Sequence, residues 1–407
     1  MKILLITQHF PPERGAVRRL YEFAGYFQKN GHDVTVLTAM PNYPDGVIPR
    51  KYRGKFSYRE NMDGIEIVRS WVLPASNGQP KKRMVGFLTF LTSSLINSFR
   101  IKGKFDIILA SSPPVTSAVL GYIISRIRRA KLVLEIRDLQ PEMGVQYGSL
   151  KASRFTKVLK RVMNSIYKKA WKIVCVTEGL THWMNKRGIS DDKVSTIKSG
   201  VGRNFIDSHS NGIRKKYGWE DKFLVLFTGT MGTVRSLEPI IESARMLADD
   251  KRYHFAFVGD GQRRKTYEAL AEQYNLTNIS FVDLQPLEQI PYFLHAGDVL
   301  VDSLKDVPFA RSVLPVKMYE YMAAGKPIIF GSPAREATRF LDQAGGALTF
   351  SVKRPEQLTK LIQDLYQHKI DGDNLGKRYH EYVKAHHTTE KWARQYLDIL
   401  ENSHSSR

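Results

Sequence analysis

The sequence predicts an α/β protein made of two doubly wound, Rossmann-like domains that face each other across a cleft. Its 407 residues favour two or three domains. In both halves, strand-like apolar runs alternate with helical segments, which is the pattern of a parallel sheet covered by helices. A stretch rich in Gly, Ser and Asn, residues 199–212, suits a hinge between the halves. We therefore expect a first domain over 1–200 and a second over 201–384, with a C-terminal helix over 385–402 that packs back on the first.

The spacing of apolar residues places the individual elements. Residues 17–27 and 118–126 have helical periodicity, and Trp392, Tyr396 and Leu400 share one face of the last helix. Strands are predicted in the first half at 3–6, 33–37, 65–70, 107–111, 132–136 and 172–176. Strands are predicted in the second half at 223–227, 254–258, 279–282, 299–301 and 328–330, with helices near 236–249, 262–275, 287–295 and 315–324.

The composition narrows the class of protein. Hydrophobic residues make up 42% of the chain and charged residues 25%, as in ordinary globular proteins. The single cysteine, Cys175, lies in an apolar run, which indicates a core thiol and excludes an internal disulfide or a zinc site built on cysteines. Residues 371–373, Asp-Gly-Asp, indicate an exposed turn, and we predict no metal site and no cofactor. The chain opens on a strand without a secretory signal, so we expect a cytoplasmic protein.

The positive charge is confined to one half of the chain. Residues 1–200 contain 34 Lys and Arg against 14 Asp and Glu, whereas residues 201–407 contain 28 against 26. Such asymmetry predicts that the first half faces an anionic partner, with anionic lipid and nucleic acid as the candidates.

Two basic segments are candidates for contact with a membrane. Residues 84–99 form an apolar run bounded by cations at 81–83 and at Arg100. The run is shorter and more polar than a transmembrane helix, which needs about 20 apolar residues, and suits an interfacial helix. Residues 151–172 place Phe155, Leu159, Val162, Ile166 and Tyr167 on one side and lysines elsewhere. We expect peripheral attachment to the inner face of the plasma membrane; the alternative is a helix packed on the sheet with a solvated basic face.

Residues 312–327 are the most informative stretch for function. Pro315 suits a first helical position, and Gly325 suits the left-handed position after a helix end. Lys317 and Glu320 share one face of the predicted helix. A lysine at a helix N-terminus binds anions, and a glutamate one turn later accepts hydrogen bonds from a hydroxyl pair. The pair predicts a nucleotide diphosphate held by its phosphates and its ribose, with a surface ion pair on a packed helix as the alternative.

A second phosphate-binding candidate follows the first strand of the second half. Gly229 and Gly232 would let backbone N–H groups approach phosphate oxygens, and Arg235 adds a positive charge. The glycine spacing does not complete a dinucleotide fingerprint, and a simple tight turn is the alternative.

The first half carries candidate residues at the carboxyl ends of two strands. The loop after the first strand contains His9, Gly15 and Arg18, although His9 also suits a purely structural histidine. Arg137 and Asp138 follow the strand at 132–136. They either pair with each other or contact a sugar, with Asp138 taking the proton of the attacking hydroxyl.

Together these motifs resemble family 4 of the retaining glycosyltransferases, which has the GT-B fold. The resemblance covers nearly the whole chain and is strongest to the bacterial surface-polysaccharide branch of the fucosamine-transferase and colanic-acid type. It rests on residues 9–13 (HFPPE), 31–36 (GHDVTV), 41–46 (PNYPDG), 112–114 (SPP), 137–142 (RDLQPE), 229–232 (GTMG), 258–261 (VGDG) and 317–327 (KMYEYMAAGKP).

The resemblance implies a metal-independent transfer with retention at the anomeric carbon. The implied donor is a UDP-linked N-acetylated amino sugar, and the implied acceptor is a lipid-linked saccharide of O-antigen, capsule or exopolysaccharide synthesis. Glu320 is then expected to bind the ribose. The other predicted donor-binding residues are Gly15, Gly229, Thr230, Gly232, Arg235, Arg311, Ser312, Val316 and Lys317. The predicted acceptor-side residues are His9, Arg18, Arg137 and Asp138.

The chain departs from the broader family pattern at two donor positions. Ser312 stands where many members have a second glutamate, and Thr230 stands where many have an arginine. We expect Arg311 or Lys317 to replace the missing positive charge. Preorganised N–H groups and cations would then stabilise the leaving diphosphate without a metal, and the predicted catalytic residues are Asp138, Arg235 and Lys317.

Two other classes of protein remain as alternatives. A sugar-nucleotide epimerase has a similar two-domain fold, but it does not need the basic amphipathic segments. A nucleic-acid-binding protein is suggested only by charge, since aromatic residues do not alternate with the basic runs and no binding motif is recognisable.

Overall fold

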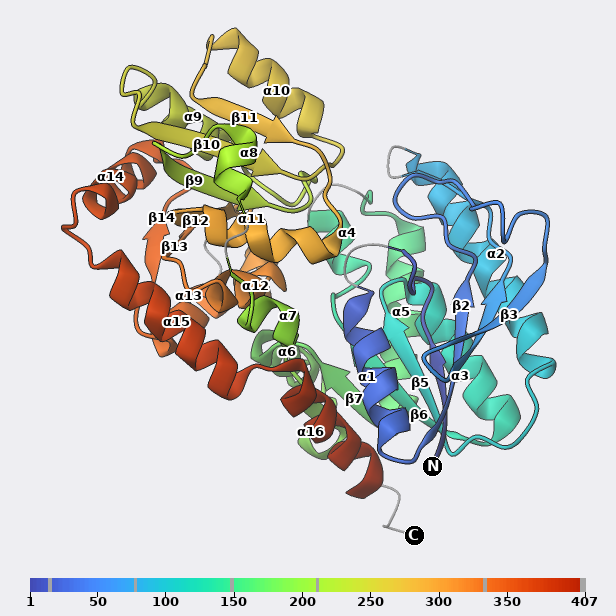
Figure 1. Ribbon diagram of the computed structural model, residues 1–407. Helices are drawn as coiled ribbons and strands as arrows, with labels where there is room; N and C mark the ends of the chain where they lie inside the picture. The colour runs from blue at the N-terminus through green and yellow to red at the C-terminus, as the bar shows by residue number, and fades with distance from the viewer. Residues whose placement is uncertain (14–16, 77–78, 147–149, 210–211, 332–334, 403–407) are drawn as a thin grey trace. The chain divides into compact units, whose positions relative to one another are not determined.

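The computed structural model describes residues 1–13, 17–76, 79–146, 150–209, 212–331 and 335–402. The chain forms two compact units. Unit 1 comprises Met1–Ser199 and Thr389–Arg407, and unit 2 comprises Gly200–Thr388. Each unit contains one sheet flanked by helices (Figure 1).

The sheet of unit 1 has the strand order β3-β4-β2-β1-β5-β6-β7-β8. Neighbouring strands are parallel except for β3 and β4, which form an antiparallel hairpin at one edge. The strands are β1 (Lys2–Ile6), β2 (Asp33–Ala39), β3 (Ser57–Met62), β4 (Ile65–Ser70), β5 (Ile107–Ser112), β6 (Lys131–Ile136), β7 (Lys172–Cys175) and β8 (Val194–Thr196). The central strands β1 (KILLI) and β5 (IILASS) are buried along nearly their whole length, as expected for parallel strands with helices on both faces of the sheet.

Different sets of helices cover the two faces of this sheet. On one face, α1 and α16 enclose a core with the inward side chains of the central strands. On the other face, α3 packs on β5, where Gly121 backs so closely onto Ala110 that an added Cβ would lie 2.4 Å from the alanine Cβ. The helix α3 also contacts α2 and α5. The helices of unit 1 are α1 (Arg18–Lys29), α2 (Pro80–Phe99), α3 (Val115–Arg128), α4 (Glu142–Gln146), α5 (Arg154–Lys169), α6 (Glu178–Lys186) and α16 (Thr389–Asn402), with a 3-10 turn at Asp191–Lys193.

The C-terminal helix α16 is part of the core of unit 1. Tyr396 is fully buried, and its ring makes edge-to-face contacts with Phe23 and Phe27 of α1, each with centroids 5.8 Å apart. The helix begins at Thr389, later than the predicted start at 385, because α15 continues to His386.

Unit 2 is a wholly parallel sheet with the strand order β11-β10-β9-β12-β13-β14. Its strands are β9 (Phe223–Thr228), β10 (Tyr253–Val258), β11 (Ile279–Val282), β12 (Val299–Ser303), β13 (Ile328–Gly331) and β14 (Leu348–Phe350). Its helices are α7 (Arg203–Ile206), α8 (Ile213–Tyr217), α9 (Glu238–Met246), α10 (Arg264–Gln273), α11 (Ile290–Ala296), α12 (Lys317–Ala323), α13 (Arg335–Gln343), α14 (Pro355–Tyr366) and α15 (Gly372–His386), with 3-10 turns at Leu287–Gln289 (η2) and Pro308–Ser312 (η3). Separate apolar clusters lie on the two faces of the sheet.

The structure adds three strands that the apolar pattern did not reveal: β3, β8 and β14. The strand β3 is mostly polar, lies at the edge of the sheet and contains no fully buried residue. Its turn to β4 is Asp63-Gly64, and both residues have positive φ. This dipeptide is the strongest short-range hairpin signal and was available in the sequence.

Two local predictions are wrong. The helix α12 begins at Lys317, so Pro315 lies before the helix and is not its first residue. In α5, the buried side is formed by Thr156, Met163, Ile166 and Tyr167, while Phe155 and Val162 are exposed. The prediction placed the apolar residues of α5 on one side, but the helix has two apolar stripes and only one of them is buried.

Among the described residues, no helix is both long enough and apolar enough to cross a membrane.

The packing of α16 gives a prediction about stability. Tyr396→Ala should reduce the free energy of unfolding of unit 1 by about 3–5 kcal/mol, since it leaves a cavity between two aromatic rings. Arg394→Ala, at an exposed position of the same helix, should change it by less than about 0.5 kcal/mol. Urea denaturation of both variants measures the difference, and equal midpoints would contradict the assignment of α16 to the core.

Candidate functional site

In each unit one of the loops that carry candidate residues, the loop after β1 or the loop after β9, lies where the strand order reverses. In doubly wound sheets, ligands bind outside the carboxyl ends of the strands at this switch point. In unit 2 the switch point lies between β9 and β12, and in unit 1 it lies between β1 and β5.

The loop after β9 is fixed by close backbone contacts. Gly229 has φ +122°, a conformation that favours glycine, and Gly259 packs directly against it. The N–H of Met231 donates to the carbonyl of Asp260 at 2.9 Å. Gly232 is different, because an added Cβ would make only an ordinary contact with Thr230. The backbone of the free protein therefore does not require glycine at 232.

Lys317, the first residue of α12, contacts the end of β9, where this loop begins. Its ammonium donates to the carbonyl oxygen of Thr228 at 2.6 Å and lies 4.0 Å from the centroid of the Phe227 ring. A Cβ on Gly229 would approach Nζ of Lys317 to 2.9 Å. The hydroxyl of Tyr321, one turn later, accepts from the N–H of Thr228 at 2.9 Å. The lysine is thus held at the carboxyl end of β9 and is not the surface residue of the alternative interpretation.

A fully buried carboxylate, Asp302 at the end of β12, joins two candidate cations. It forms an ion pair with Arg235, and one of its oxygens lies 3.7 Å from Nζ of Lys317. The side chains of Arg235 and Lys317 are only 13% and 10% exposed. The sequence analysis missed Asp302, although an acidic residue at the carboxyl end of an apolar strand was a usable signal. We call Arg235, Asp302 and Lys317 the cation cluster.

The surroundings change the basicity of Lys317. Burial, assisted by repulsion from Arg235 and opposed by Asp302 and Glu320, lowers the pKa of Lys317 from 10.5 to about 7. Desolvation therefore outweighs the nearby carboxylates, and the neutral form of the Lys317 amine becomes accessible near neutral pH.

The other predicted donor-binding residues are not members of this cluster. Glu320 is half-buried in the first turn of α12, and Val316, just before the helix, is 44% exposed. Thr230 and Arg311 are exposed, and in the described part of the chain Arg311 makes no ion pair. Lys317 thus joins the cluster and Arg311 does not. The backbone of Ser312 ends η3, and Gly15 lies outside the described residues.

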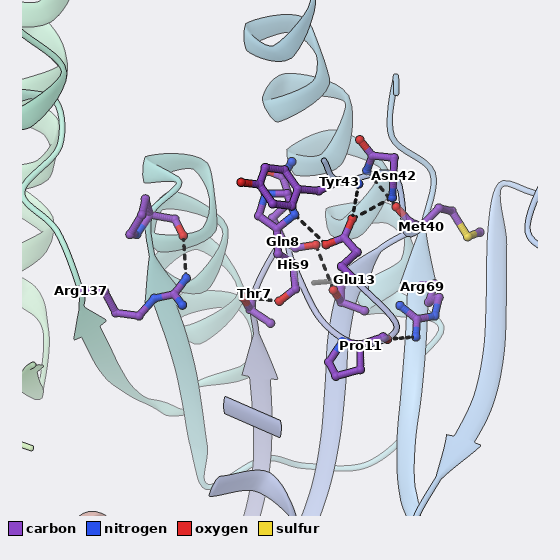
Figure 2. Close-up of polar contacts among 12 residues, drawn as sticks. Thr7, Gln8, His9, Pro11, Glu13, Met40, Asn42, Tyr43, Arg69 and Arg137 are labelled. Carbon is purple, nitrogen blue, oxygen red and sulfur yellow. Dashed lines mark hydrogen bonds and ion pairs between the residues drawn. The ribbon is translucent and has the colours of Figure 1, made fainter. Parts of the chain in front are cut away.

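In unit 1, His9 is held by a buried glutamate (Figure 2). Its Nδ1 lies 2.7 Å from Oε2 of Glu13, whose other oxygen accepts from the N–H groups of Asn42 and Tyr43 at 2.7 and 2.9 Å. The Tyr43 ring lies 5.2 Å from the imidazole. Glu13 therefore ties the loop after β1 to the loop after β2 and fixes the ring of His9, a role that the sequence analysis did not assign.

Arg137 and Asp138 directly follow β6. The guanidinium of Arg137 donates to the carbonyl of Pro113 at 3.4 Å, in the loop after β5 (Figure 2). Burial raises the pKa of Asp138 to about 6, although the charge of Arg137 opposes this. Asp138 is half-buried, so its carboxyl group is suited to exchange a proton near neutral pH. Arg18 pairs with Glu22 of the same helix.

The neighbouring arginine of α1 is structural. Arg19 pairs with the fully buried Glu135 at 3.3 Å and donates to the carbonyls of Lys198 and Ile197 at 2.6 and 2.8 Å. It therefore anchors the end of unit 1 near residue 198. Within the described ranges, no group of three or more His, Cys, Asp or Glu side chains is arranged to hold a metal ion.

Comparison with known proteins covers both units. The model of Glycosyltransferase Family 4 matches residues 14–204, and that of Glycosyl transferases group 1 matches residues 210–386. The putative colanic acid biosynthesis glycosyl transferase WcaI of Escherichia coli is 24% identical over 378 residues, spanning 90% of this chain and 92% of WcaI.

Solved structures show the fold. Sucrose-phosphate synthase from Thermosynechococcus elongatus superimposes with a TM-score of 0.77 at 16% identity, with all of both chains covered. HepE from Anabaena, in complex with UDP-glucose, superimposes with a TM-score of 0.72 at 15% identity, over 99% of this chain and 100% of HepE. These comparisons favour a transferase over the epimerase and the nucleic-acid-binding alternatives. The chain belongs to the glycosyltransferases of the family 4 type and has the GT-B fold.

Proposed function

We propose that unit 2 binds a nucleotide-diphosphate sugar and that unit 1 binds the acceptor. The observation that supports the donor site is the cation cluster. It places two buried basic side chains beside the loop after β9, which contains Gly229 and Gly232 and which we call the glycine loop, at the switch point of unit 2. Arg235 and Lys317 would neutralise the diphosphate, and Gly232 would allow its close approach. Glu320 would accept hydrogen bonds from the ribose hydroxyls. Anabaena HepE, whose structure contains UDP-glucose, supports UDP as the nucleotide.

The chemistry that this arrangement favours is departure of the diphosphate. Breaking the sugar–phosphate bond develops negative charge on the leaving group, and cations fixed in a desolvated site stabilise that charge most strongly. We propose that retention follows from attack on the face of the sugar from which the diphosphate leaves. Asp138 is the candidate to take the acceptor's proton, with Arg137 and His9 orienting the acceptor.

The likeness to WcaI supports a place in surface-polysaccharide synthesis, where we propose that the acceptor is a lipid-linked saccharide. One face of unit 1 suits a lipid surface. The helices α2, α3 and α5 contain eleven Lys or Arg and no Asp or Glu. They also carry nine of the sixteen exposed large hydrophobic side chains among the described residues: Met84, Val85, Leu88, Ile96, Phe99, Ile127, Phe155, Val158 and Val162. We call these three helices the basic layer and propose that it docks on an anionic leaflet.

The ribose assignment predicts the behaviour of a Glu320 variant. Glu320→Ala should weaken UDP binding roughly ten- to hundredfold, because hydrogen bonds to a charged group contribute about 1.5–3 kcal/mol. Glu356→Ala, at an exposed position of α14, is the matched control. Isothermal titration with UDP measures both, and circular dichroism checks the fold. Undiminished affinity in Glu320→Ala would remove the glutamate from the site.

The activity itself is tested with a panel of labelled nucleotide sugars and a bacterial membrane extract. We expect label from one donor to enter a lipid-extractable product, at the same rate with and without EDTA. The anomeric configuration of the product, determined by NMR, should match that of the donor. Loss of turnover in EDTA with recovery on adding magnesium would disprove the metal-independent mechanism.

Docking of the basic layer predicts selective binding to vesicles. The protein should sediment with phosphatidylglycerol-containing liposomes, less so with phosphatidylcholine liposomes, and less in high salt. Phe155→Glu with Val158→Glu should reduce the bound fraction severalfold, since both side chains are more than half exposed. Leu287→Glu, at an exposed apolar position of unit 2, should have no effect. Equal recovery on the two kinds of liposome would contradict the docking surface.

A further inference from the structure

The cation cluster holds two basic side chains, Arg235 and Lys317, and one carboxylate, Asp302, in a buried place. Two carboxylates face Lys317: the fully buried Asp302 from β12 and the half-buried Glu320 from its own helix. The guanidinium of Arg235, from the loop after β9, opposes them. Among the residues that the structure describes, the other groups in contact with Lys317 are neutral: the ring of Phe227, the carbonyl of Thr228 and the phenol of Tyr321.

Asp302 is engaged mainly by Arg235. The guanidinium pairs directly with one carboxylate oxygen, while Nζ of Lys317 lies 3.7 Å from the other, which also accepts from the N–H of Ser303 at 2.9 Å. The short contact of Lys317 is instead to a neutral carbonyl oxygen, at 2.6 Å. One carboxylate is therefore shared between two cations, and the lysine receives the smaller part.

This geometry supports an inference that deepens, and rests on, the donor site proposed above. In the free protein, Lys317 donates a hydrogen bond to the carbonyl of Thr228 and lies beside the Asp302 carboxylate. We propose that the amine of Lys317 takes up a proton from solvent when the diphosphate binds. Asp302 is then a positioning residue that holds Arg235 in place and keeps Lys317 beside the glycine loop. The diphosphate supplies the negative charge that the free cluster lacks.

The direction of the proton movement follows from the charges. In the free protein the pKa of Lys317 is lowered to about 7, chiefly by burial. A diphosphate beside the ammonium favours the charged form, so the pKa of Lys317 is higher in the complex. Below pH 7 the lysine is already charged and binding takes up no proton at this residue. Above pH 7 binding requires protonation, and the affinity falls by up to tenfold per pH unit until the pKa of the complex is reached.

The test is isothermal titration of the full-length protein with UDP at about pH 8, in two buffers with different enthalpies of ionisation. The terminal phosphate of UDP has a second pKa of about 6 and is ionised under these conditions. The difference in observed enthalpy between the buffers gives the protons exchanged, and we expect uptake of close to one proton per UDP.

Variants identify the residue responsible. Lys317→Met should bind UDP more weakly, with no proton uptake and with an affinity that does not change with pH above 7. Lys317→Arg keeps a permanent charge, so it should bind without proton uptake. Lys353→Met, at a lysine that is 79% exposed in the same unit, should retain the full uptake.

The possible outcomes distinguish failure of this inference from failure of the proposed donor site. UDP binding by the unmodified protein without proton uptake would overturn the inference and leave the donor site intact. Uptake that persists in Lys317→Met would assign the proton to another group and would also overturn it. Absence of any UDP binding would overturn the donor site and the inference together.

Discussion

Parallel strands end together at one edge of their sheet, and this constraint brings the candidate residues of unit 2 into contact. The register of β12 against β9 pairs Val299 with Val225 and Leu300 with Leu226. The same register sets Asp302 level with Thr228, whose carbonyl accepts from Lys317. The loop after β9 then folds back against the end of β12, where Arg235 forms a bridge with Leu304. Three residues from distant parts of the chain thus meet because of a single strand pairing.

The free-energy cost of burying these charges explains how the cluster can bind an anion. A buried ion is expensive unless it is paired, and here two cations share one fully buried carboxylate. The lowered pKa of Lys317 reports that cost, since the neutral form becomes accessible near pH 7. A site with unbalanced positive charge and little water interacts strongly with an incoming anion. In the mechanism that we propose, the charge imbalance that destabilises the free site would favour binding of a diphosphate, and it would stabilise the leaving diphosphate more strongly as negative charge develops on it.

The sequence was sufficient for the central strands of both sheets and insufficient for three of the outer strands and for the details of the site. Apolar runs located the central strands, because a parallel strand buried on both faces has no alternating pattern to obscure it. The edge strand β3 escaped because its residues, Ser57–Met62, are polar on both faces. Lys317 and Arg235 were predicted from local motifs, whereas the position of Asp302 at the end of an apolar strand gained its meaning once the strand order placed β12 beside β9. The hydrogen bonds of Glu13 with the loop after β2 likewise depend on tertiary structure.

The composition of unit 1 also supports our proposal that the anionic partner of the basic layer is a lipid surface and not nucleic acid. The opposite face of unit 1 carries acidic residues in its helices, such as Glu22 in α1 and Asp398 in α16, whereas the basic layer has none. Within that layer, phenylalanines account for only Phe99 and Phe155 of the exposed large hydrophobic side chains, and the others are aliphatic or Met. Single-stranded nucleic acid binds to stacking aromatic platforms, whereas a bilayer accepts aliphatic side chains between lysine and arginine contacts to phosphate groups. The composition of this face therefore favours a lipid surface over nucleic acid.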